Sequence, residues 1–227
     1  MRRNRSASGP WHLRRFRARC FLLLVVPFLW GCGLGGALFK AIFLRSGAPP
    51  GDEIRRMEAR EETMLRELPH RRILVLPVNV LNYEATPRPQ AARMLAGMLR
   101  DAGYPGAEAS TRSYPLPFPR QPNQAWLYWK RFRALADSIR ASPPGGVDYI
   151  LLLDIVAATR DDGTLRGIGG IHVMTVTGSG EMAYGRLRNS MHDIFQEFQP
   201  ESMADASRLA VADLRAASGH RTSRPEG

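Results

Sequence analysis

The most apolar stretch of the chain is residues 21–44, FLLLVVPFLWGCGLGGALFKAIFL, in which Lys40 is the only charged residue. About twenty apolar residues are enough to span the hydrocarbon core of a bilayer. The preceding residues 1–19 contain seven arginines and no acidic residue. Such a positive flank is retained in the cytoplasm. The pattern therefore predicts a basic cytoplasmic tail at 1–19, a membrane segment at 20–44 and an extracytoplasmic remainder.

The membrane segment has two interpretations. In the first, it is an uncleaved transmembrane helix. In the second, Leu29-Trp30-Gly31-Cys32 resembles the lipobox of bacterial lipoprotein signal peptides, in which a small residue precedes the cysteine that becomes acylated. Trp30 departs from that pattern, and the apolar residues after Cys32 depart from the polar tether that is usual there. Both interpretations place residues 46–227 outside the cytoplasm, and Cys32 is the candidate lipidation site.

Residues 45–70 are predicted to form a linker followed by a helix. The helix begins after Pro49-Pro50-Gly51, with acidic residues in its first turn, and Pro69 ends it. Its apolar positions allow either a short coiled-coil stalk or a helix that lies on its own domain. The lack of sustained heptads favours the second interpretation.

Residues 71–217 show the periodicities of an α/β domain. Strands are predicted near 72–78, 107–112, 148–156, 171–176 and 181–188, and helices near 90–102, 123–141 and 201–217. This order predicts a single layered domain with a mixed sheet flanked by helices, preceded by the membrane anchor helix. The run at 148–156, apolar apart from Asp148 and Asp154, predicts that Leu151 and Leu153 are covered on one face and Leu152 on the other.

Glycines mark two turns and a tail closes the chain. Thr177-Gly178-Ser179-Gly180 is predicted to close a hairpin, and Gly167-Ile168-Gly169-Gly170 is predicted to be a turn. Residues 218–227 are polar and are predicted to form a disordered tail.

The charge of the chain does not indicate nucleic-acid binding. The formal net charge is +11, but nine of these charges precede residue 46, which leaves +2 for the rest. A nucleic-acid footprint requires basic residues gathered on the folded domain. Both cysteines, Cys20 and Cys32, lie in or beside the apolar run, so we expect no disulfide in the domain. No histidine pair has a metal-binding spacing, and no nucleophile, base and orienting group occur together, so we expect no metal, cofactor or catalytic site.

A proline-aromatic segment is the candidate interaction site. Tyr114, Leu116 and Phe118 alternate with three prolines, each of which restricts the backbone φ angle. A segment ordered in advance loses little entropy on docking, and apolar anchors supply most of the binding energy at interfaces. These three residues are predicted to bind a partner; the alternative is that they pack onto their own sheet.

Four segments together resemble the small α/β domain of bacterial envelope lipoproteins such as the curli secretion channel, and the amino-terminal domain of the Tol system's periplasmic propeller protein. They are Ile73-Leu74-Val75-Leu76-Pro77, the helix at 90–102, Val147-Asp148-Tyr149-Ile150-Leu151-Leu152 and the hairpin at 177–180. The resemblance implies binding or assembly in the envelope and carries over no functional residue.

We therefore expect a non-enzymatic, membrane-anchored protein on the periplasmic face of the bacterial envelope, which binds or helps to assemble another envelope component. Its oligomeric state is left open. The alternative is an envelope hydrolase, or another enzyme, with a site assembled from isolated residues such as Asp148, Asp154, His172 and His192.

Overall fold

A computed structural model of the protein describes residues 51–82, 84–118, 125–159 and 165–219. Within these ranges one mixed sheet is formed by β1 (Ile73–Val75), β2 (Val78–Leu81), β3 (Ala85–Arg88), β4 (Ala107–Ala109), β5 (Tyr149–Thr159), β6 (Leu165–Thr177) and β7 (Met182–Asn189). The helices are α3 (Gly51–Glu67), α4 (Pro89–Asp101), α5 (Ala125–Ala141), α6 (Asp193–Phe198) and α7 (Met203–Ala217), with a 3-10 turn at Leu68–His70. The predicted α/β domain with a mixed sheet and flanking helices is confirmed.

Strand β5 is the centre of the sheet. Strands β1 and β2 pair in parallel with successive parts of β5, and β6 pairs with it in antiparallel orientation. Outside these, β4 lies beside β1, β3 beside β2 and β7 beside β6. Because β5 has neighbours along its length, its apolar run is buried at the middle of the sheet.

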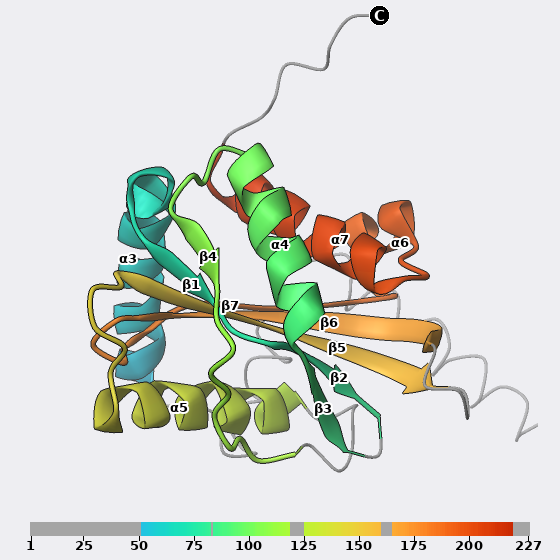
Figure 1. The fold of residues 1–227 in the computed structure, drawn as a ribbon, viewed down its shortest axis with the longest axis horizontal. Coiled ribbons are helices and arrows are strands. Elements are labelled where there is room, and N and C mark those ends of the chain that lie inside the picture. The colour runs from blue at the N-terminus through green and yellow to red at the C-terminus, as the bar shows by residue number, and fades with distance from the viewer. Residues whose placement is uncertain (1–50, 83, 119–124, 160–164, 220–227) are drawn as a thin grey trace, which may run out of the picture. The chain divides into compact units, whose positions relative to one another are not determined.

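Helices cover both faces of the sheet (Figure 1). Helices α4, α6 and α7 lie on one side and α5 on the other. Leu151 and Leu153 are 1% and 0% exposed in the cluster beneath α4 and α7, and Leu152 is 2% exposed in the cluster beneath α5. The prediction that both faces of this strand are covered is confirmed.

Helix α3 lies on the domain, as the second interpretation of its pattern expected. Its residue Met57 is buried in the cluster beneath α5, while Met64 and Leu65 of the helix and Leu68 of the following 3-10 turn are buried in the opposite cluster. The helix packs along β7 between the two ends. It therefore covers the outer strand on this side of the sheet.

Two glycine predictions had different outcomes. The hairpin at 177–180 is confirmed, since Thr177 donates its N–H to the Glu181 carbonyl at 2.8 Å and Gly180 has φ +84°. The turn at 167–170 is wrong, because these residues lie within β6. At Gly170 a Cβ atom would come within 2.9 Å of the Arg188 carbonyl of β7. Glycine at this position therefore allows β6 and β7 to approach each other closely.

The β2–β3 hairpin and α6 were not predicted. Pro77 interrupts the first apolar run and Pro87 lies within β3, so neither strand produces an uninterrupted pattern. Helix α6 has six residues, too few for a clear helical period.

Candidate functional site

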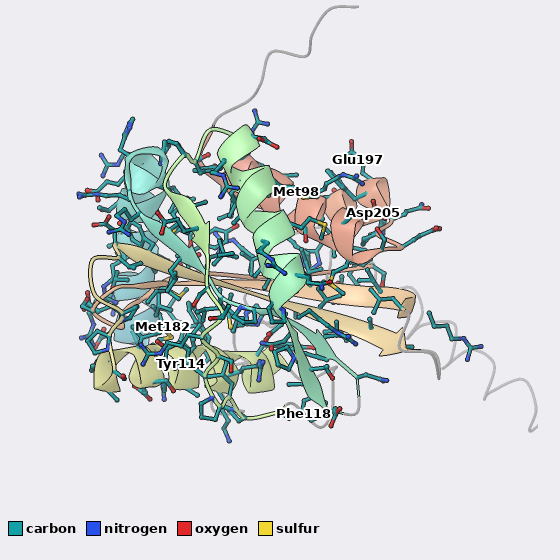
Figure 2. The ribbon with its side chains drawn as sticks, viewed as in Figure 1. Met98, Tyr114, Phe118, Met182, Glu197 and Asp205 are labelled. Carbon is teal, nitrogen blue, oxygen red and sulfur yellow. The ribbon has the colours of Figure 1, made fainter. Side chains whose placement is uncertain are left out.

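The proline-aromatic segment, residues 110–118, is called here the strap. It follows β4 and lies on the α5 side of the sheet (Figure 2). Its prolines Pro115 and Pro117 are exposed, whereas the three residues predicted to bind a partner are half-buried: Tyr114, Leu116 and Phe118. Tyr114 and Leu116 pack against the apolar cluster beneath α5. The strap thus presents its prolines to solvent and its larger side chains partly to the domain.

Polar contacts hold the start of the strap against the end of α5. Arg112 donates from Nη2 to the Ser142 hydroxyl at 2.6 Å, and its guanidinium lies 4.9 Å from the centre of the Tyr114 ring. The Tyr114 hydroxyl donates to the Ser142 carbonyl at 3.5 Å. Partial burial raises the pKa of Tyr114, while the neighbouring Arg112 lowers it. The ring is therefore neutral at physiological pH.

A buried arginine holds the other end. Helix α5 buries Tyr128, Phe132, Leu135 and Ile139 at helical spacing, and Arg131 lies on the same face, 1% exposed. Its Nη1 donates to the Pro117 carbonyl at 3.0 Å. The strap therefore runs back along α5, from beyond the end of the helix to its first half.

The other two nitrogens of the Arg131 guanidinium bind Asp154 of β5, which is 0% exposed. Arg131 Nε donates to Oδ2 at 2.5 Å and Nη2 donates to Oδ1 at 3.1 Å. Asn79 of β2 donates from Nδ2 to the same Oδ1 at 2.8 Å. Such bidentate, charge-assisted contacts fix both direction and distance. Two strands, one helix and the strap are thereby joined through a single carboxylate.

His172 completes this buried polar cluster. It faces Asp154 across the β5–β6 pairing, and its ring meets the Tyr128 ring edge to face at a centroid distance of 5.1 Å. Burial lowers the pKa of His172 to about 4; Asp154 opposes this effect and Arg131 adds to it. Burial and then Asp154 raise the pKa of Tyr128 to about 12. Both rings are neutral at pH 7 and act as packing groups.

The residues of the alternative enzymatic site are only partly brought together. Asp154 and His172 are neighbours, but Asp148 lies at the start of β5, where it accepts the Arg72 N–H at 2.9 Å. His192 lies at the start of α6, with Nδ1 2.9 Å from the Asn189 side-chain oxygen. Both oxygens of Asp154 bind Arg131, and the Asp154–His172 pair is enclosed. Among the residues described, no three potential metal ligands gather.

Arg131 was missed from sequence, although two signals pointed to it. It is a lone charge on the buried face of an amphipathic helix, and Asp154 is a lone charge within an apolar strand covered on both faces. Buried charges are paired. Arg131 therefore needed an acidic partner and Asp154 a basic one, and each was a candidate partner for the other.

The basic tail, the anchor, Cys32 and residues 220–227 of the predicted final tail lie outside the described residues. Within the part of the chain that is described, no helix combines the length and apolarity needed to cross a membrane. The anchor and Cys32 lipidation stay predictions.

Comparison with known proteins shows no family for this chain. No protein-family model and no curated protein matches the chain. Among solved structures, PelC from Paraburkholderia phytofirmans, crystallised as a dodecamer, has a TM-score of 0.30 at 16% identity and covers 66% of this chain and 88% of its own. A single-substitution variant of the same dodecamer has a TM-score of 0.33 at 13% identity and covers 68% and 90%. These scores are too low to assign a function.

Proposed function

We propose that the chain is a membrane-anchored protein of the bacterial envelope that binds another envelope protein through the strap and has no enzymatic activity of its own. The anchor part of the proposal is supported by the arginine-rich flank and apolar run of residues 1–44. The binding part is supported by the geometry of the strap.

The contact that carries the binding part is the hydrogen bond from Arg131 to the Pro117 carbonyl. Burying a guanidinium is costly unless its donors are satisfied, and here one of them is directed at an outer segment rather than at the core. The prolines restrict the same segment from within the backbone. The strap is therefore ordered before any partner arrives, which reduces the entropy lost on binding.

The half-buried side chains of the strap suit this role. Tyr114 and Leu116 contribute to the domain and still expose part of their surface, and Phe118 is also half-buried. Aromatic groups that are held in place and partly exposed are the usual anchors of interfaces.

A photo-crosslinking residue tests the binding part in the native envelope. It replaces Phe118 in one variant and Met191 in a matched control, because Met191 is an apolar residue, 68% exposed, in the turn between β7 and α6. We expect a defined crosslinked partner from position 118 that is missing from position 191. Equal crosslinking from both positions would mean that the strap is not the binding site.

Affinity for the partner thus identified gives the second test. Tyr114→Ser and Phe118→Ser should each weaken binding by more than about 1 kcal/mol. Phe118→Ser should change folding stability little, whereas Tyr114→Ser also removes packing against the cluster beneath α5 and should cost some stability. If stability falls by several kcal/mol and binding falls with it, the strap is core packing.

The anchor part has separate tests. A reporter active only outside the cytoplasm, fused after Gly227, should be active, and a reporter active only in the cytoplasm should be silent. Mass spectrometry of the mature amino terminus separates an acylated Cys32 from an intact chain that retains Met1.

A further inference from the structure

Helix α3 begins on the α5 side of the domain. Near its start, Glu53 accepts a hydrogen bond from Arg133 of α5 at 2.5 Å, and Met57 is buried beneath α5. Further along, Met64 and Leu68 are buried in the opposite cluster. The helix therefore crosses the sheet edge from the α5 side toward the α4 side, as Figure 1 shows.

Ion pairs fix α3 in this position on β7. Arg60 pairs with Glu181 at 2.8 Å, and Arg186 pairs with Glu61. Burial raises the pKa of Glu61, while Arg186 acts in the opposite direction. Together with the fully buried Met64 and Leu68, these contacts make α3 an integral part of the domain. The point at which the chain enters the domain is thus fixed.

The connection to the predicted anchor is short. Six residues, 45–50, separate the end of the predicted anchor from Gly51. They can span at most about 20 Å when fully extended. A domain of this length has a radius of gyration of roughly 16 Å and hence a diameter of about 40 Å. An anchor at 20–44 on a tether shorter than the domain is wide would keep the α5 side nearer to the membrane than the α4 side.

The α5 side of the domain is also more basic than the α4 side. The exposed charges of α5 are Lys130, Arg133, Asp137 and Arg140, three basic and one acidic, and Arg112 adds a further base from the strap. On the opposite side, α4, α6, α7 and the turn before α7 together carry four basic and five acidic residues that are exposed or half-buried: Arg93, Arg100, Arg208 and Arg215, and Asp101, Asp193, Glu197, Glu201 and Asp205. The net charge of these groups is −1 on that side and +3 on the α5 side. Figure 2 shows Glu197 and Asp205 on that side, and Tyr114 and Phe118 on the α5 side.

We propose that the α5 side of the domain, with the strap, rests against the anionic headgroups of the membrane in which the chain is anchored. The inference rests on the anchor part of the proposed function and is independent of the protein partner. Basic groups near an anionic surface are attracted within a Debye length, about 10 Å at 0.1 M salt. A partner bound at the strap would then meet the domain at the membrane surface.

Two matched arginines allow a direct test. Arg140 of α5 and Arg208 of α7 have side chains that are 60% and 61% exposed, and each pairs with an aspartate three residues earlier in its own helix, at 2.8 and 2.6 Å. Each is replaced by cysteine in the full chain and labelled with a fluorophore; Lys130→Cys gives a second position on α5. The wild-type chain, labelled at Cys20 and Cys32, gives the background.

The labelled chains are reconstituted into vesicles of phosphatidylcholine with 30% phosphatidylglycerol and a trace of lipid that carries a nitroxide quencher on its headgroup. We expect the label at position 140 or 130 to be quenched at least threefold more than the label at 208. The difference should shrink in pure phosphatidylcholine and in 0.5 M NaCl.

Each outcome decides the proposal. Equal quenching on the two sides, or stronger quenching at 208, overturns it while leaving the anchor intact. A difference that is unchanged by lipid charge and by salt overturns the role of the anionic headgroups. A chain that fails to float with the vesicles overturns the anchor, and this inference with it.

Discussion

Replacing the Arg131–Asp154 pair tests whether the buried cluster determines the fold of the strap. The variants are Arg131→Met, Asp154→Leu and the double variant, made in residues 49–227, which contain the whole compact unit of the folded domain. Both side chains are essentially unexposed, at 1% and 0%, so each single change leaves a buried, unpaired charge. Loss of one partner from such a pair costs about 3–5 kcal/mol.

The double variant should be far less destabilised than the sum of the single variants. With both charges removed, the principal remaining cost is the Asn79 amide, which loses its partner, and an unsatisfied buried polar group costs about 1–3 kcal/mol. A domain stability above about 6 kcal/mol, within the usual range of about 5–15 kcal/mol, leaves each single variant folded. Urea denaturation at pH 7, followed by circular dichroism, gives the three changes in free energy of unfolding and their coupling.

Strap order is measured separately, by trypsin cleavage after Arg112. Because a methionine side chain has no donor for the Pro117 carbonyl, cleavage should accelerate in Arg131→Met and equally in the double variant, even though the double variant is stable. Single variants that lose less than about 1 kcal/mol would refute the burial of the pair. A stable double variant with wild-type cleavage would refute the control of the strap by Arg131.

Three further predictions concern the faces of the sheet. The pKa of His172 is lowered from 6.5 to about 4 in the folded state, so as the pH falls the unfolded chain binds a proton at this residue before the folded chain does. Between pH 6.5 and pH 4, the free energy of unfolding of the wild type should therefore fall by up to about 3 kcal/mol more than that of His172→Leu. Parallel curves of stability against pH for the two proteins would contradict this. Gly185→Ala should cost about 1–3 kcal/mol, because its Cβ would lie 2.8 Å from the Phe132 ring, whereas Gly167→Ala, which meets nothing within 4 Å, is the control for thermal unfolding. Leu152→Ala should cost about 2–5 kcal/mol in urea denaturation, and an unchanged midpoint would mean that the α5 face is open.

The elements were largely readable from local pattern. Residues 149–153 form an unbroken apolar run, and both of its faces are covered in the fold. Gly103 follows α4 with φ +96°, as its role at a helix end required. These features follow from side-chain periodicity and from the few residues that adopt special backbone angles.

Other features depend on neighbours distant in sequence. Gly170 looked like a turn residue, and only the passage of β7 beside it makes it a strand residue. His172 was noted as a candidate, but its neutrality comes from burial opposite Asp154, which the β5–β6 register determines. A local pattern of residues does not encode the register between strands or which elements pack over a residue.

The sequence by itself thus determined that the chain has a basic flank before an apolar segment, an α/β order of elements and a strap of alternating prolines and larger apolar residues. Only the tertiary structure decided what supports the strap, because the crossing of α5 over β5 brings Arg131 within reach of both Asp154 and the Pro117 carbonyl. The tertiary structure alone also decided where the chain enters the domain, because α3 is fixed by contacts with β7 and α5 that lie far along the chain. Periodicity specifies which face of an element is apolar, whereas pairing between elements depends on packing geometry that local sequence does not contain.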